Sequence, residues 1–446
     1  MASLLTVWLP KLSALTWNRT KDINMPNFIP VAVTYMFVSA ATLLFSGSVQ
    51  AQDGCGIERD VTPQPLNEPT WKRMNDVYED IGEENYDLAY QKLLNMTQRS
   101  RGGVYLQAIV QQLIGQVEWA RENFDEALRA FEKAVDLDAL PDLPHYSLMY
   151  QIAQLYYMKD RYDDSLRSLD LWMCKVPAEK VKASAHILKA SLYAAKEDWA
   201  NVVPSVETAI EMTDEPKESW YLLKLASHHE LEDKASARDT LKVMINLWTD
   251  KKIYWVQLSN VYFQLENDKQ ALSVIVLAHR KNLLNKQTDY LYISNMYALR
   301  DVPFKSAEVL QEGIEKGIVE PSEKHWKMVA DSWFTAEEME DALVAYEKAG
   351  AAALDGEIDL RRGYILIDLE RWALARDALA LAIDKGGISE RKLGEAHLMV
   401  GMSQFNLGNY DDASAAWGRA SRYQKTKEAA RQWMNHMREE RARKAP

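Results

Sequence analysis

One pattern recurs along most of the chain and constrains its fold more than any other feature of the sequence. The clearest copy runs from Gly401 to Ala420 and reads G-M-S-Q-F-N-L-G-N-Y-D-D-A-S-A-A-W-G-R-A. We use its small residue Ala413 as a reference position. The equivalent reference positions along the chain are Ala89, Ala127, Ser165, Val202, Ala237, Ala271, Ala307, Ala342, Ala375 and Ala413. Successive reference positions are 33 to 38 residues apart, so the sequence predicts ten copies of one supersecondary unit.

Each copy has the spacing of two helices joined by a tight turn. Gly401 is small enough to let two helices approach closely, and Gly408 allows the chain to reverse direction. Ala413 and Trp417 then fall on one face of the second helix. The first helix has a signature of its own, W-x-x-L-small-x-x-Y, at 255–262. This is the tetratricopeptide (TPR) pattern, and it predicts an all-α TPR superhelical solenoid of about ten helix pairs, in which each unit contacts its neighbours.

The repeats divide the chain into four parts. We assign residues 1–51 to a signal peptide or signal anchor, 52–69 to an extended arm, 70–425 to the TPR array and 426–446 to a capping helix and tail. The last helix is amphipathic and could cover the exposed face of the tenth unit. Its basic end could instead bind an anion, but we favour the cap.

The N-terminal part has the composition of an export signal. An apolar run at 28–45 follows three basic residues and gives way to small, uncharged residues that end at Ala51. These features predict cleavage after Ala51 and a mature chain that begins at Gln52. The 18-residue run is also at the lower limit for spanning a bilayer, so an uncleaved anchor is the alternative. Membrane contact is expected only through this segment, and the protein itself is expected in the periplasm.

The predicted mature chain keeps two cysteines, Cys55 and Cys174. An exported protein could join them in a disulfide, because disulfides persist in oxidising compartments. The alternative is two unpaired thiols, and the sequence leaves both open.

Charge and motif content argue against several classes of function. The chain has 53 Lys and Arg against 65 Asp and Glu and no sustained basic stripe, which disfavours a nucleic-acid partner. No phosphate-binding loop, zinc helix, nucleophile elbow or C-x-x-C pair occurs. His228 and His229 are adjacent on a predicted helix and point in different directions, so we expect a structural role for them. We predict no enzyme activity, no catalytic residue, no metal and no cofactor.

First helices of such arrays line a concave groove. Counted from the reference positions, the predicted groove combines amides, which can bond an extended backbone, with aromatic rings, which can bury apolar side chains. The predicted protein-binding residues are Gln154, Tyr157, Asn260, Phe263, Gln264, Asn295, Asp331, Phe334 and Phe405. The alternative is that these residues fill the inside of a tight superhelix.

Two units depart from the pattern. In the fourth unit Pro204 lies two residues past Val202, so the second helix must either start late, with Asn201 as its cap, or kink at the proline. The seventh unit needs one extra residue before Pro303.

Four segments exceed the generic repeat pattern. They read Q-L-Y-Y-M-K-D-R-Y-D-D-S-L at 154–166, K-E-S-W-Y-L-L at 217–223, K-K-I-Y-W-V-Q-L-S-N-V-Y at 251–262 and V-P-F-K-S-A-E-V-L-Q-E-G-I at 302–314. In these segments the chain resembles the exported TPR proteins encoded beside TonB, ExbB and ExbD in some Gram-negative bacteria. The resemblance implies a periplasmic accessory of TonB-dependent uptake that binds a protein or peptide segment, a TonB-system component among the candidates, and it implies no catalytic residues. An adaptor for envelope assembly or polysaccharide export is the alternative, and an enzyme within the solenoid is disfavoured by the missing motifs.

Overall fold

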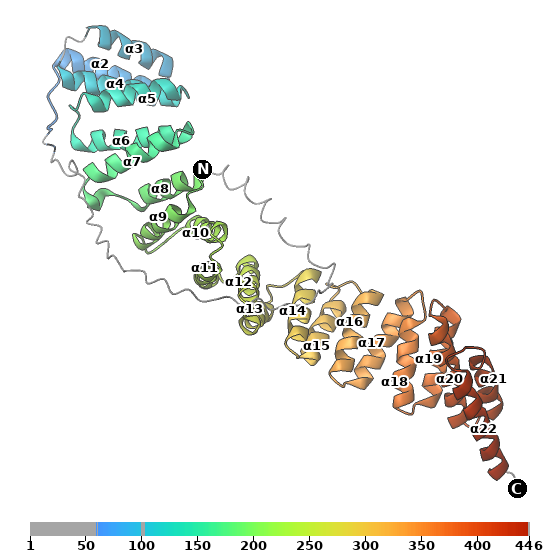
Figure 1. Cartoon of the computed structure of the whole chain (residues 1–446). Helices are drawn as coiled ribbons and strands as arrows, with labels where there is room; N and C mark the ends of the chain where they lie inside the picture. The colour runs from blue at the N-terminus through green and yellow to red at the C-terminus, as the bar shows by residue number, and fades with distance from the viewer. Residues whose placement is uncertain (1–58, 60, 100–102, 445–446) are drawn as a thin grey trace, which may run out of the picture. The chain divides into compact units, whose positions relative to one another are not determined.

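The computed structural model describes residues 59, 61–99 and 103–444 (Figure 1). These residues form α-helices and one short 3-10 helix, η1 (Ala178–Lys180), and contain no strand. The predicted signal segment and Cys55 lie outside the described residues.

The helices follow one another in ten pairs, and we call each pair a unit. Units 1 to 5 are α2 (Glu68–Gly82) and α3 (Tyr86–Arg99), α4 (Val104–Ala120) and α5 (Phe124–Asp136), α6 (Asp142–Met158) and α7 (Tyr162–Lys175), α8 (Ala183–Ala195) and α9 (Trp199–Glu211), and α10 (Glu218–Glu230) and α11 (Lys234–Leu247). Units 6 to 10 are α12 (Lys252–Gln264) and α13 (Asp268–Arg280), α14 (Gln287–Leu299) and α15 (Pro303–Glu315), α16 (Glu323–Thr335) and α17 (Met339–Ala352), α18 (Glu357–Asp368) and α19 (Trp372–Lys385), and α20 (Glu390–Asn406) and α21 (Tyr410–Ala420), followed by α22 (Lys427–Lys444). Each helix packs against the next one in the chain, which is the nearest-neighbour packing of a solenoid. The predicted all-α TPR superhelix is confirmed.

None of the described helices has both the length and the apolar character that a bilayer span requires.

The same turn joins the two helices of all ten units. Its central residue has a positive φ and stands five positions before the reference position. In unit 5, for example, this residue is Glu232 (φ 55°), and the N–H of Asp233 donates to the carbonyl of His228, five residues back. That bond is the longer one of a Schellman motif, which satisfies carbonyls at the end of a helix. The turn residues are Glu84, Glu122, Asp160, Glu197, Glu232, Glu266, Asp301, Glu337, Glu370 and Gly408.

This turn corrects the predicted register of unit 7 by one residue. Asp301 has the positive φ there (54°), so the reference position is Ser306 and not Ala307. The Ser306 hydroxyl lies 2.9 Å from that of Ser294, across the helix pair. Ser306 and Ala307 are both small and buried, so the sequence pattern alone could not show which of them is the reference position.

The two helices of a unit approach closely where the first carries glycine. A Cβ on Gly401 would lie 2.3 Å from Nε1 of Trp417, which is a severe overlap. Gly115 has the same relation to the ring of Phe131, with a shortest distance of 2.3 Å. The predicted reason for glycine at 401 is therefore confirmed.

The second helix of unit 4 does not start late. It begins at Trp199, with Asp198 as its cap, and continues through Pro204, so the late start with Asn201 as the cap is wrong. Hydroxyl groups of Ser205 and Thr208 donate to the carbonyls of Asn201 and Pro204. These are additional bonds to carbonyls next to the proline, whereas the carbonyl that loses its backbone donor at Pro204 is that of Ala200, four residues back.

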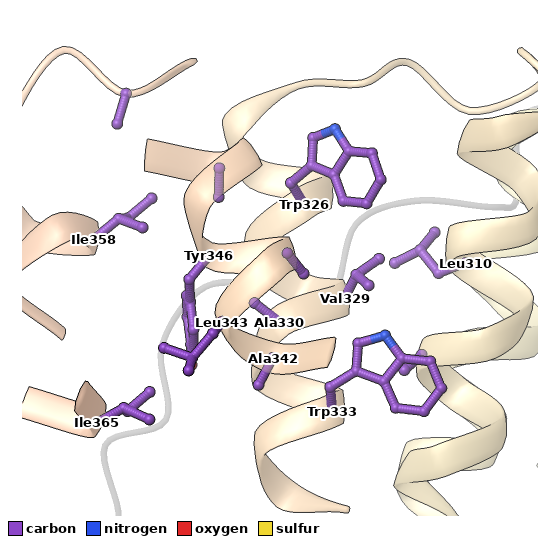
Figure 2. Close-up of a cluster of buried hydrophobic side chains, with 14 of the residues drawn as sticks. Leu310, Trp326, Val329, Ala330, Trp333, Ala342, Leu343, Tyr346, Ile358 and Ile365 are labelled. Carbon is purple, nitrogen blue, oxygen red and sulfur yellow. The ribbon is translucent and has the colours of Figure 1, made fainter. Parts of the chain in front are cut away.

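Apolar packing is continuous in the C-terminal half. One cluster of buried side chains extends from Trp255 in α12 to Ala416 in α21. Figure 2 shows part of it, where side chains from α15, α16, α17 and α18 interdigitate. Trp326 lies under the ammonium of Lys348 in α17 at 4.2 Å, and Tyr346 donates its hydroxyl to Asp331 in α16 at 2.6 Å. Both aromatic residues therefore connect the two helices of unit 8.

The last helix covers the open side of unit 10. Trp433 of α22 stacks on Trp417 at a centroid distance of 5.7 Å, and Ala430 and Met437 are buried beside it. This is the arrangement expected of a cap, because a terminal repeat needs a cover over its apolar face.

The arm before α2 is fixed at a distant point of the array. The Arg59 guanidinium donates to the carbonyl of Leu140 at 3.0 Å and pairs with Asp138 at 2.7 Å. Its side chain is only 10% exposed and lies 6.0 Å from the ring of Tyr146. Arg59 therefore ties the arm to the junction between units 2 and 3.

Cys174, at the end of α7, is disulfide-bonded. Its predicted partner Cys55 lies outside the described residues, and the Cys55–Cys174 pairing stays a prediction.

Candidate protein-binding groove

Eight of the nine predicted groove residues occupy two equivalent positions on the first helices. Gln154, Asn260, Asn295 and Asp331 lie eleven residues before the corrected reference positions, and Tyr157, Phe263, Phe334 and Phe405 lie eight before them. The remaining residue, Gln264, follows Phe263. The register correction at Ser306 brings Asn295 into line with Asn260.

The open part of this surface lies on α12 and α14. Phe263 is 46% exposed, and Asn260, Gln264 and Asn295 are partly or fully exposed. Two further apolar residues there were not predicted: Ile253, 54% exposed on α12, and Leu299, 55% exposed on α14. We call these six residues the open groove.

Polar contacts hold α12 and α14 side by side. Lys252 donates to the carboxylate of Asp289 at 2.9 Å, and the hydroxyls of Ser259 and Tyr292 lie 2.9 Å apart. The open groove is therefore a surface formed by two neighbouring helices. Leu299 stands seven residues before Ser306, outside the two positions counted in the sequence analysis, and Ile253 precedes the buried pair Tyr254 and Trp255.

Asp331 and Phe334, on α16, are already engaged within the chain. Asp331 accepts the hydroxyl of Tyr346 and pairs with Lys327 at 2.7 Å and with Arg361 at 3.2 Å. Phe334 packs against the large cluster, with the guanidinium of Arg361 above its ring at 5.4 Å. Burial, reinforced by the bond to Asp331, raises the pKa of Tyr346 above its usual range. Asp331 and Phe334 therefore stabilise the packing of the chain, and these contacts make them less available to a ligand.

Phe405 does not line an open surface. It lies 6.1 Å from the ring of Trp433 and 5.9 Å from that of Trp417, in the cluster that α22 covers. We therefore correct its assignment, since the capping helix occupies the space that a ligand would need.

Tyr157 and Gln154 lie far along the chain from the open groove, on α6. Tyr157 packs against Tyr162 at 6.0 Å and joins a cluster with α7, and burial raises the pKa of its hydroxyl. Gln154 is half-buried next to it. Both are on the predicted helix face but are separate from the residues on α12 and α14.

Two of the segments that exceed the repeat pattern meet at the joint of units 5 and 6. Glu218, in the K-E-S-W segment, accepts hydrogen bonds from the ammonium of Lys251 and the hydroxyl of Tyr254. Both donors lie in the K-K-I-Y-W segment. Burial, together with that bond, raises the pKa of Tyr254. These motif residues position α12 against α10 and hence position the open groove.

The part of the chain that the structure describes contains no group of His, Cys, Asp and Glu residues that could hold a metal ion. His228 is buried, and burial lowers its pKa, so it is neutral near pH 7. His229 points elsewhere and is exposed.

Comparison with protein-family models agrees with the fold. A tetratricopeptide-repeat family model matches residues 113–172. Among solved structures, the chain is similar to a tetratricopeptide repeat protein from Parabacteroides merdae at 12% identity, over 69% of this chain and 99% of that one, with a TM-score of 0.35. It is also similar to MamA from Desulfovibrio magneticus at 13% identity, over 42% and 99%, with a TM-score of 0.34. A chain of the APC/C hetero-tetramer Cut9-Hcn1 is similar at 14% identity, over 83% and 77%, with a TM-score of 0.25.

No curated protein matches the sequence. The repeat spacing, the ten identical turns and the family-model match define a TPR protein. TPR arrays act as scaffolds for protein–protein interaction and are generally not enzymes.

Proposed function

We propose that this protein is a periplasmic TPR scaffold whose open groove binds an extended segment of a TonB-system component. One observation carries the proposal: Phe263 and Leu299 are half exposed beside Asn260 and Asn295 on two neighbouring first helices. Exposed apolar side chains bury area on binding, and amides bond the backbone of an extended chain.

The disulfide at Cys174 supports the periplasmic location, because such bonds persist in oxidising compartments and are rare in the cytosol. The apolar segment at 28–45 and its small-residue exit agree with export.

The TonB association rests on the resemblance of the four motif segments. The contact of Glu218 with Lys251 and Tyr254 gives two of them a shared role, since together they set the joint beside the groove. A scaffold of this kind needs no chemistry of its own, only a rigid surface for its partner.

The proposal is tested by capturing partners from the native envelope fraction with the parent chain and with the double variant Phe263→Ala/Leu299→Ala, followed by calorimetry with the purified partner. Loss of two anchors should weaken binding by about 2 kcal/mol or more, at least roughly tenfold in Kd. Leu277→Ala, on second helix α13 and 47% exposed in the parent, is the matched control and should bind like the parent.

If the double variant bound as tightly as the parent, the open groove would not be the binding site. Capture of components of envelope assembly or polysaccharide export, without any TonB-system protein, would favour the alternative adaptor function.

A further inference from the structure

The first-helix surface changes character between units 6 and 9. On α12 and α14 the charged residues Lys252 and Asp289 pair with each other, and the exposed residues Phe263 and Leu299 are apolar. On α16 and α18 the surface carries the cations Lys324, Lys327 and Arg361 together with the carboxylates Glu323, Asp331 and Glu357, of which Glu357 pairs with Lys392. The chain as a whole has a formal net charge of −12, whereas Lys327 and Arg361 share a single carboxylate, Asp331.

Lys327 and Arg361 are held in place by one carboxylate. Asp331 pairs with both, at 2.7 Å and 3.2 Å, and is itself fixed by the hydroxyl of Tyr346. The guanidinium of Arg361 lies over the rings of Phe334 and Tyr346, at 5.4 Å and 5.2 Å. The aromatic rings orient the planar cation, which lowers the entropy that it would lose on binding an anion.

These cations keep capacity for a further anion. The side chains of Lys327 and Arg361 are each 44% exposed, so an incoming carboxylate reaches them without a large desolvation cost. A guanidinium has five N–H donors and an ammonium three, and Asp331 uses only part of them. One carboxylate against two cations leaves a local charge of about +1, and the charge of exposed Lys324 is offset by its exposed neighbour Glu323.

We infer that the groove selects an extended protein segment with an apolar anchor for Phe263 and Leu299 and, a few residues along, acidic side chains for Lys327 and Arg361. The inference rests on the proposed function and specifies the chemistry of the partner. Neighbouring helices are about 10 Å apart and an extended chain advances about 3.3 Å per residue. The acidic residues should therefore lie roughly three to six positions from the anchor.

The experiment is selection of displayed random dodecapeptides on the purified, immobilised full chain at low salt. We expect enriched peptides to combine an aromatic or aliphatic residue with Asp or Glu at that spacing, and to be poor in Lys and Arg. Their Kd should rise at least tenfold when the acidic residues are replaced by Asn or Gln, and binding should weaken as salt is raised. No enrichment, or enriched peptides without an excess of Asp and Glu, would overturn the inference.

Variants locate the effect on the chain. Lys327→Gln/Arg361→Gln should reduce affinity for the acidic peptides at least tenfold and leave affinity for their neutral forms within about threefold. Lys324→Glu reverses one charge without touching the Asp331 contacts and should weaken acidic peptides alone. Lys242→Gln/Arg376→Gln removes the same charge from second helices α11 and α19 and should leave the selection unchanged. If both double variants reduced the affinity for acidic peptides equally, the effect would come from the overall charge of the chain, and the inference would be contradicted.

Failure of the two proposals is distinguishable. If acidic peptides are selected at Lys327 and Arg361 but no TonB-system protein is captured, the partner assignment is wrong and the peptide chemistry stands. If a TonB-system protein is captured through Phe263 and is insensitive to Lys327→Gln/Arg361→Gln, the acidic preference is wrong and the proposed function stands.

Discussion

Units 1–5 and units 6–10 are built from the same helix pair but are held together differently. In units 6–10 most of the buried side chains belong to one cluster that extends from Trp255 to Ala416, with a smaller cluster beneath α22. In units 1–5 the buried side chains divide among five smaller clusters, the last of which along the chain also includes residues of α12 in unit 6. The comparison shows that a repeat pattern fixes the unit and leaves the strength of the joints to residues outside the pattern.

Polar contacts at the turns connect the first four units. Arg121 pairs with Asp87 at 2.9 Å, Lys159 pairs with Asp125 at 2.7 Å, and Lys196 pairs with Asp163. Each cation stands six residues before a reference position and reaches the preceding unit. In units 5 and 6 the same positions are Leu231 and Leu265, which cannot form an ion pair. Exposed pairs contribute little individually, so the N-terminal half should be the more easily loosened.

The largest expected effect is in the continuous core. Trp326→Ala removes a buried ring from the cluster and should lower the free energy of unfolding by about 3 kcal/mol or more. Urea denaturation measures it, with Phe263→Ala, at an exposed position, as the control that should cost less than about 1 kcal/mol. A loss below about 1 kcal/mol for Trp326→Ala would show that this core does not hold units 6–10 together.

The Arg59 contact should stabilise the N-terminal half. Arg59→Ala leaves the carbonyl of the buried residue Leu140 without its donor and should cost about 1 to 3 kcal/mol. Hydrogen exchange should show faster opening of α5 and α6, with α16 and α17 unchanged. Arg129→Ala, which removes an exposed pair with Glu126, is the control. Equal exchange in the two variants would mean that the arm does not tie units 2 and 3.

Replacing a turn residue that has a positive φ by glycine should stabilise the chain. Glu232→Gly relieves a left-handed conformation that side chains disfavour, and should stabilise the chain by roughly 1 kcal/mol. Glu230→Gly, at the last residue of the preceding helix, should instead destabilise the chain, because glycine is a poor helix former. If both variants changed the melting temperature in the same direction, the result would contradict the turn geometry.

The smallest effect concerns the turn ion pairs. The hydrogen bond from Lys159 holds the pKa of Asp125 below its usual 3.8. This pair therefore stabilises the fold above pH 3.8, and its contribution is lost as the pH falls through the lower folded-state pKa. In an NMR titration Lys159→Met should return the pKa of Asp125 towards 3.8, whereas Lys133→Met, on the same helix as Asp125, should not. An unchanged pKa of Asp125 in the Lys159→Met variant would show that the pair is absent in solution.

The sequence predicts the helix pairs well because small and aromatic residues at fixed spacing record the packing of each pair. It does not predict the chemistry of the turn within each unit, since nine of the ten turn residues with positive φ are Glu or Asp and only Gly408 is glycine. It misplaces unit 7 because Ser306 and Ala307 are both small and both buried.

The groove is harder to predict because exposure depends on neighbours that are distant in sequence. Phe263, Phe334 and Phe405 occupy one equivalent position. Only Phe263 is left exposed, since Arg361 covers Phe334 and α22 covers Phe405. The Arg59 contact spans 81 residues and has no sequence signature.

The central claim is that the open groove on α12 and α14 contacts a TonB-system protein. The most direct test places a photoreactive benzophenone amino acid at position 263 in the native host, and at position 277 as the control on the second helix of the same unit. We expect a crosslink from position 263 to a periplasmic domain of a TonB-system component and none from position 277. Crosslinks of equal yield from both positions, or products from position 263 that contain no protein of that system, would contradict it.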